Sequence, residues 1–102
     1  MTSQGHPRTV FRRALERGNL LVAEATAREV GQVSLGEALE LTALVALHDR
    51  ERGGRYAVRW LHRWLAERGP TIDQAVMAAG CLAELGGGEH DAALAALRTL
   101  RR

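Results

Sequence analysis

Apolar positions recur three and four residues apart over six stretches of the chain, which is the spacing of amphipathic helices. Glycine, proline and capping residues separate these stretches. The predicted helices are Pro7–Arg17, Leu20–Val30, Leu35–Asp49, Arg55–Arg68, Ile72–Leu85 and Glu89–Leu100. The connections are short, so neighbouring helices are expected to be antiparallel. The pattern predicts an all-α domain of about six helices, either a short solenoid or a compact bundle.

The starts of two helices carry the same local signal. Ser34 is followed three positions later by Glu37, and Thr71 is followed three positions later by Gln74. A hydroxyl residue with Glu or Gln at this spacing forms a capping box, in which each side chain accepts a hydrogen bond from the backbone of the other residue. We therefore expect helices to begin directly after Ser34 and Thr71.

Two helices differ in the distribution of their apolar residues. The stretch from Leu35 to Leu47 is apolar almost all round, with only Glu37 and Glu40 charged, which predicts a central helix. The next helix is amphipathic and has an apolar stripe of Ala57, Trp60, Leu61, Trp64 and Leu65 opposite Arg55, Arg59 and Arg63. The stripe predicts that both tryptophans lie in the core. The alternative is an exposed aromatic surface that stacks on single-stranded nucleic acid.

Three similar glycine-containing turns suggest an internal repeat. Glu16–Gly18 leads to Ala23, Glu51–Gly53 leads to Ala57, and Leu85–Gly87 leads to Ala92. Gly53 and Gly54 are interpreted as the break between the third and fourth helices. A period of about 35 residues predicts a two-helix unit repeated three times. The three hairpins would cover residues 7–31, 34–69 and 71–102 of a single domain, and residues 1–6 would form a disordered tail.

The third unit resembles a tetratricopeptide repeat. Ala79 and Gly80 fall where that family places its Leu-Gly pair, and Ala83 falls where it places a large helix residue. Gly87 falls at the turn glycine, and Ala92 and Ala96 fall at two small packing residues. In the second unit, comparable positions are occupied by Leu44, Val45, Ala57, Leu61 and Trp64. The resemblance implies helical hairpins whose first helices line a concave surface that binds a peptide or a helix.

Net charge says little about partners. All 14 basic residues are arginine, but 12 carboxylates are interleaved with them, and the formal charge is +2. Such a balance produces no strong field of the kind that attracts nucleic acid over a distance.

The candidate function is therefore a protein interaction module without catalysis, whose partner is another protein or a second copy of the chain. By the resemblance, Arg8, Arg12, Asp49, Arg50 and Met77 lie on the concave surface, along with Leu39, Thr42 and Ala46. The alternative for this surface is that its residues simply complete the core. The weakly charged C-terminal helix is a candidate for homodimerisation, because solenoids normally end with a polar outer face.

The alternative function is nucleic-acid binding. Arg55, Arg59 and Arg63 occupy one helix face at four-residue spacing, and they form the candidate contact with a phosphate backbone. The competing interpretation is a solvated helix face, because Asp49, Glu51 and Glu67 are near enough in sequence to pair with these arginines.

No motif for catalysis, for a metal or for a cofactor stands out, so the chain is expected not to be an enzyme. The four histidines are dispersed and lack the spacing of a zinc site. Cys81 is the only cysteine and excludes an internal disulfide, which favours a reducing compartment. With no apolar stretch long enough for a membrane span, we expect a cytoplasmic protein.

Overall fold

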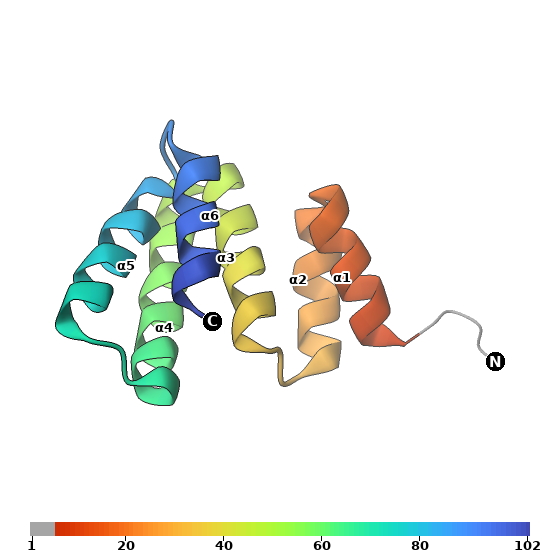
Figure 1. Ribbon diagram of the computed structural model, residues 1–102. Coiled ribbons are helices and arrows are strands. Elements are labelled where there is room, and N and C mark those ends of the chain that lie inside the picture. Colours follow the sequence, from red (N-terminus) through yellow and green to blue (C-terminus); the bar gives the residue numbers. More distant parts are fainter. Residues whose placement is uncertain (1–5) are drawn as a thin grey trace.

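The computed structural model describes residues 6–102 and contains six α-helices in this range, with no strand (Figure 1). Their bounds are α1 Pro7–Arg17, α2 Leu20–Val30, α3 Leu35–His48, α4 Arg50–Arg68, α5 Ile72–Glu84 and α6 His90–Leu100. The all-α prediction is confirmed. Residues 1–5 of the predicted tail lie outside the described residues. The remaining one, His6, caps α1, because its Nδ1 accepts a hydrogen bond of 3.2 Å from the Arg8 backbone N–H.

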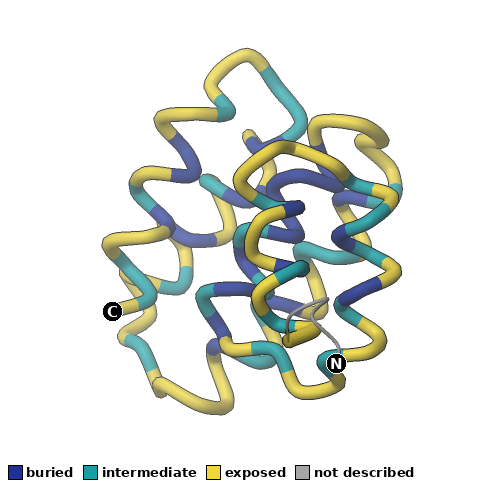
Figure 2. The backbone as a smooth tube through the Cα atoms, turned by 90° about the vertical axis from the view of Figure 1, so that its right-hand side faces the viewer, coloured by how far each residue is buried: buried dark blue, intermediate teal, exposed yellow. Residues whose placement is uncertain are grey.

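Successive helices run up and down and form three antiparallel hairpins, α1–α2, α3–α4 and α5–α6 (Figure 1). The molecule measures 48 × 28 × 20 Å, with α1 towards one end of the long axis and α5 at the other. As predicted, α3 is the central helix. It contacts α1, α2, α4 and α6. Across the molecule, buried segments lie towards the interior and exposed ones towards the outside (Figure 2).

The core has two parts, and α3 contributes to both. Phe11 and Ala23 pack with Leu41 and Val45 of α3 in the part formed by the first hairpin. The other part is larger and joins α3 to α4, α5 and α6. Its buried members include Leu35, Leu39, Ala43, Trp60, Trp64, Ala78, Leu82, Leu85, Ala93, Leu94 and Leu97. A helix that is apolar on nearly every side can supply both parts, which explains the composition of α3.

Both predicted capping boxes are present. Ser34 Oγ accepts from the Glu37 N–H at 3.1 Å, and Glu37 Oε1 accepts from the Ser34 N–H at 2.8 Å. Thr71 and Gln74 exchange the equivalent hydrogen bonds at 3.1 and 2.9 Å. These bonds satisfy backbone donors that a helix start otherwise leaves unpaired, so α3 and α5 begin where the sequence predicts.

The predicted break at Gly53 and Gly54 is wrong. The helix α4 begins at Arg50, directly after its N-cap Asp49, whose Oδ1 accepts from the Arg52 N–H at 3.1 Å. Both glycines lie inside the helix. A Cβ added to Gly53 would lie 2.5 Å from Ala46 Cα, so Gly53 serves the close approach of α4 to α3.

The position of the third hairpin differs from the expected solenoid. A surface lined by all three first helices requires α1, α3 and α5 side by side, but the backbone of α3 runs beside that of α6, and no Cα of α3 lies within 8 Å of a Cα of α5. Leu94 and Leu97 of α6 enter the core beside α3, and Arg98 forms two hydrogen bonds with Glu40 at 2.7 and 2.8 Å. These contacts place α6, rather than α5, next to the central helix.

The expected floor of the concave surface is also buried. Leu39, Thr42 and Ala46 are at most 7% exposed. The alternative interpretation therefore holds for these three residues, because they are part of the buried core.

The two tryptophans are buried, as the apolar stripe predicts, and their rings stack with centroids 5.6 Å apart. Their polar atoms differ. Trp60 Nε1 donates a hydrogen bond of 2.9 Å to the Leu35 carbonyl, whereas Trp64 Nε1 has no partner among residues 6–102. The base-stacking alternative requires accessible rings, and these rings are enclosed by the core.

This difference predicts unequal effects of two matched substitutions. Trp60→Phe loses a hydrogen bond, whereas Trp64→Phe removes a donor that is buried without an acceptor. We expect Trp60→Phe to lower the free energy of unfolding by about 1–2 kcal/mol more than Trp64→Phe does. Urea unfolding followed by far-ultraviolet circular dichroism measures both, and equal losses would contradict the assignment.

Candidate interaction surface

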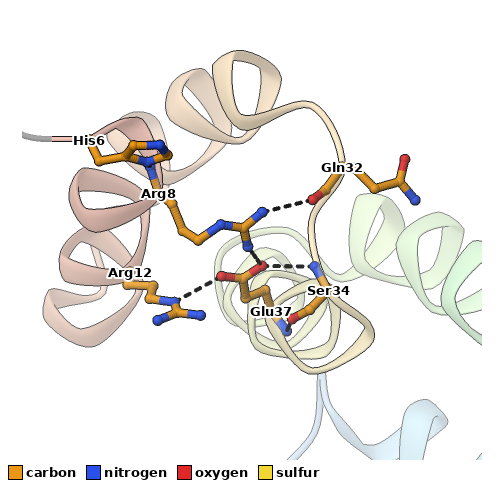
Figure 3. A network of polar contacts seen from close by, with 6 residues as sticks. All are labelled: His6, Arg8, Arg12, Gln32, Ser34 and Glu37. Carbon is orange, nitrogen blue, oxygen red and sulfur yellow. Dashed lines mark hydrogen bonds and ion pairs between the residues drawn. The ribbon is translucent and has the colours of Figure 1, made fainter.

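The start of α3 carries a buried carboxylate that joins two helices. Glu37 is 7% exposed and accepts hydrogen bonds from Arg8 Nη1 and, at 2.9 Å, from Arg12 Nε (Figure 3). Arg8 also donates to the Gln32 carbonyl at 3.0 Å. Because Glu37 simultaneously caps α3 through Ser34, one carboxylate connects α1, the α2–α3 turn and α3.

The surroundings of Glu37 strongly favour its charged form. Burial alone raises the pKa, but hydrogen bonds from Arg8, from the Ser34 backbone and from Arg12 outweigh it and lower the pKa from 4.5 to about 2. Arg8 and Arg12 are thus engaged in an internal contact, although the Arg12 side chain is still largely exposed.

A second polar network joins α2 to α4. Glu24 accepts hydrogen bonds from Arg52 Nη2 and, at 2.6 Å, from the Tyr56 hydroxyl. Burial raises the pKa of Glu24, but the hydrogen bonds from Tyr56 and Arg52 outweigh it, so the pKa is lowered. Burial and the hydrogen bond to Glu24 raise the pKa of Tyr56. Sequence reasoning missed this contact, because no periodicity relates residues on different hairpins.

The arginine row of α4 is largely occupied within the chain. Arg55 pairs with Glu51 at 3.2 Å and Arg63 pairs with Glu67 at 2.6 Å. The Arg59 guanidinium lies over the Tyr56 ring, 4.7 Å from its centroid. Each arginine therefore has a local partner, and the two carboxylates reduce the positive potential along this face.

The remaining candidates do not form one surface with Arg8 and Arg12. Asp49 caps α4 and directly follows the last residue of α3, whereas Glu37 lies in the first turn of α3. At a rise of 1.5 Å per residue, the backbones of these two residues are about 18 Å apart. Arg50 extends beside Gly86, close to the end of α5. Met77 is exposed on α5.

The most prominent unexplained feature is an apolar surface on α4 and α5. Among residues 6–102, most of the large apolar side chains that remain exposed belong to these two helices. They are Val58 (58%), Leu65 (41%), Ile72 (82%), Val76 (68%) and Met77 (58%), and we call them the α4–α5 apolar surface. By contrast, Leu21 on α2 is exposed as a single apolar residue, which is common in monomeric proteins.

Small residues make this surface concave. A groove of about 360 Å³ runs between α4 and α5, with Gly54 and Val58 on one side and Ala79 and Ala83 on the other. Arg50 is the single charged residue that lines it. A second groove, on the other side of α5, is lined by Val76, Met77, Gly80, Cys81, Glu84, Glu89, Ala92 and Ala93. The exposed side of α5 is thus a ridge between two mainly apolar grooves.

Only Met77 of this surface was among the candidates from sequence. The signal for the others was present but ambiguous, because α5 is apolar around most of its circumference. Leu65 was assigned to the buried stripe of α4, yet it is 41% exposed, since it lies at the edge of that stripe. Val58 is not part of the predicted apolar stripe, since it directly precedes Arg59 and lines a small surface hollow together with Arg55 and Arg59.

No protein-family model, no curated protein and no solved structure matches the chain. Within residues 6–102, no group of three or more His, Cys, Asp and Glu side chains is arranged to hold a metal ion. In the same range, no helix has the length and apolar character needed to cross a membrane.

Proposed function

We propose that this protein is a helical interaction module that binds another protein chain through the α4–α5 apolar surface and performs no catalysis. The proposal rests on the exposure of Ile72, Val76 and Met77 on one side of α5, which is flanked by apolar grooves. Exposed apolar surface of this kind is costly in water and is typical of protein interfaces.

Nucleic-acid binding is the less favoured function. It requires arginines that are available to phosphates, and in this chain Arg55 and Arg63 pair with carboxylates while Arg59 stacks on Tyr56. The single cysteine supports a reducing compartment, the cytoplasm, as the place where the module works.

Capture from lysate of the source cells tests the proposal. Tagged wild type is compared with Val76→Glu, which places a charge on the surface, and with Leu21→Glu, which changes a still more exposed leucine elsewhere. We expect one or more proteins that wild type and Leu21→Glu retain after nuclease treatment and that Val76→Glu loses. Retention by all three proteins, or a bound species that disappears with nuclease, would contradict the proposal.

A further inference from the structure

A polar hollow lies where the start of α3 meets α1 and the ends of α4 and α6. Its volume is about 620 Å³, and it shares no lining residue with the α4–α5 apolar surface or with the two grooves beside α5. We call it the arginine hollow, because side chains from three helix regions bring four arginines to it: Arg12, Arg68, Arg98 and Arg101.

Three carboxylates also line the arginine hollow and engage part of its positive charge. Glu37 accepts a hydrogen bond from Arg12 Nε, and Glu40 accepts two from Arg98. The other two arginines form no ion pair among residues 6–102, and neither does Glu16, the third carboxylate. Four arginines against three carboxylates leave the hollow with an excess of positive charge.

Arg101 has the most unusual surroundings of the four arginines. Its Nε is buried without a hydrogen-bond partner among residues 6–102. Its guanidinium lies against the first turn of α3, since a Cβ added to Gly36 would be 2.9 Å from Arg101 Cζ. The dipole of α6 favours a basic residue at position 101, but it does not explain a guanidinium at the positive end of a different helix. A buried donor without an acceptor is costly, and an oxyanion at this guanidinium supplies the acceptor.

We propose that the arginine hollow binds a phosphate group, either free or carried by a small molecule, with Arg101 as the main contact. The fork of Nε–H and Nη–H donors in a guanidinium matches two oxygens of a phosphate. Arg68 supplies a second arginine that is not neutralised within residues 6–102, which suits a phosphate that carries nearly two negative charges. The volume of the hollow lies within the range of small-molecule sites.

A nuclear magnetic resonance titration of the isotope-labelled protein tests the site. Inorganic phosphate and glycerol phosphate are the probes, acetate is the carboxylate control, and the ionic strength is held constant. We expect saturable shifts of the Arg101 Nε–H signal and of the Gly36 amide signal. Arg101→Gln should weaken binding on the order of 10-fold or more, because a charge-assisted paired contact is lost. Arg13→Gln should bind like wild type, since it removes an equal charge from an exposed position of α1 outside the hollow.

Two further variants separate the guanidinium fork from positive charge alone. Arg101→Lys keeps the charge but lacks the fork, so it should not restore the affinity of wild type. Glu16→Gln removes a carboxylate that repels phosphate and should strengthen binding about threefold. Circular dichroism establishes that each variant is folded.

Three results would overturn the inference: no saturable shift at up to tens of millimolar phosphate or glycerol phosphate, equal weakening by Arg101→Gln and Arg13→Gln, and acetate binding as tight as that of the phosphate probes. Tighter binding of glycerol phosphate than of inorganic phosphate would identify a phosphorylated small molecule as the ligand, and the opposite order would identify the free ion. A failed titration would leave the proposed function intact, because the arginine hollow and the α4–α5 apolar surface share no residue.

Discussion

Glu37→Ala is expected to lower the free energy of unfolding by about 3 kcal/mol, because it leaves Arg8 and Arg12 without their acceptor and removes half of a capping box. Glu40→Ala is the matched control, since it also removes a carboxylate of α3 that pairs with an arginine. The Glu40–Arg98 pair is partly exposed and should contribute at most about 1 kcal/mol. Urea unfolding of both variants gives the comparison, and similar losses would show that burial of Glu37 has no special effect.

The same carboxylate predicts how stability depends on pH. Its pKa is about 2 in the folded protein and 4.5 in its ordinary state, so the charged form is favoured by folding. The stabilisation is fully present above about pH 4.5 and is lost as the pH falls towards 2. We expect about 2 kcal/mol, after allowance for the exposure of Arg12.

Glu37→Gln isolates this contribution from the cap. Glutamine retains an oxygen that accepts the Ser34 N–H but carries no charge. The difference in stability between wild type and Glu37→Gln should therefore shrink as the pH is lowered from 4.5 towards 2. A difference that stays constant over this range would contradict the low pKa.

Gly53→Ala is the second substitution with a large expected effect. Its new Cβ would lie 2.5 Å from Ala46 Cα and 3.0 Å from the Ala46 backbone nitrogen, and backbone atoms of a central helix move only if the hairpin shifts. We expect a loss of about 3 kcal/mol, measured by thermal or urea unfolding.

Gly54→Ala provides the control in the adjacent position. Nothing lies within 4 Å of a Cβ at Gly54, so the alanine restores helix propensity without a collision. This variant should be more stable than wild type by about 0.5–1 kcal/mol. Equal stability of the two variants would contradict the close approach of α4 to α3 at Gly53.

Local signals predicted most of the helices. The capping boxes at Ser34 and Thr71 act within one turn, so their effect is readable from neighbouring residues. The error at Gly53 and Gly54 has a local and a tertiary cause. Two glycines favour a turn by propensity, but the N-cap at Asp49, a local signal, starts the helix before them, and the close approach to Ala46 is a tertiary contact that favours glycine at position 53.

The arrangement of the third hairpin was beyond sequence reasoning. The choice of α6 instead of α5 as the neighbour of α3 depends on how Leu94 and Leu97 fit the core and on the Glu40–Arg98 pair, which join residues far apart in the chain. The interaction surface follows from that choice, because the turned hairpin leaves Ile72 and Val76 in solvent.

The candidate arginines illustrate the same point. Helical spacing correctly placed Arg55, Arg59 and Arg63 in a row, but it did not predict the stacking of Arg59 on Tyr56. It also did not identify Glu37 as the acceptor for Arg8 and Arg12, because that contact joins separate hairpins.

Site-specific photo-crosslinking in cells tests whether α5 is an interface. A photoreactive amino acid replaces Val76 in one variant and Leu21 in a second, since both positions are exposed and only the first lies on the α4–α5 apolar surface. If α5 is an interface, position 76 gives a discrete protein adduct, at twice the chain mass for self-association, and position 21 gives none. An absence of adducts from position 76, or equal adducts from both, would contradict it.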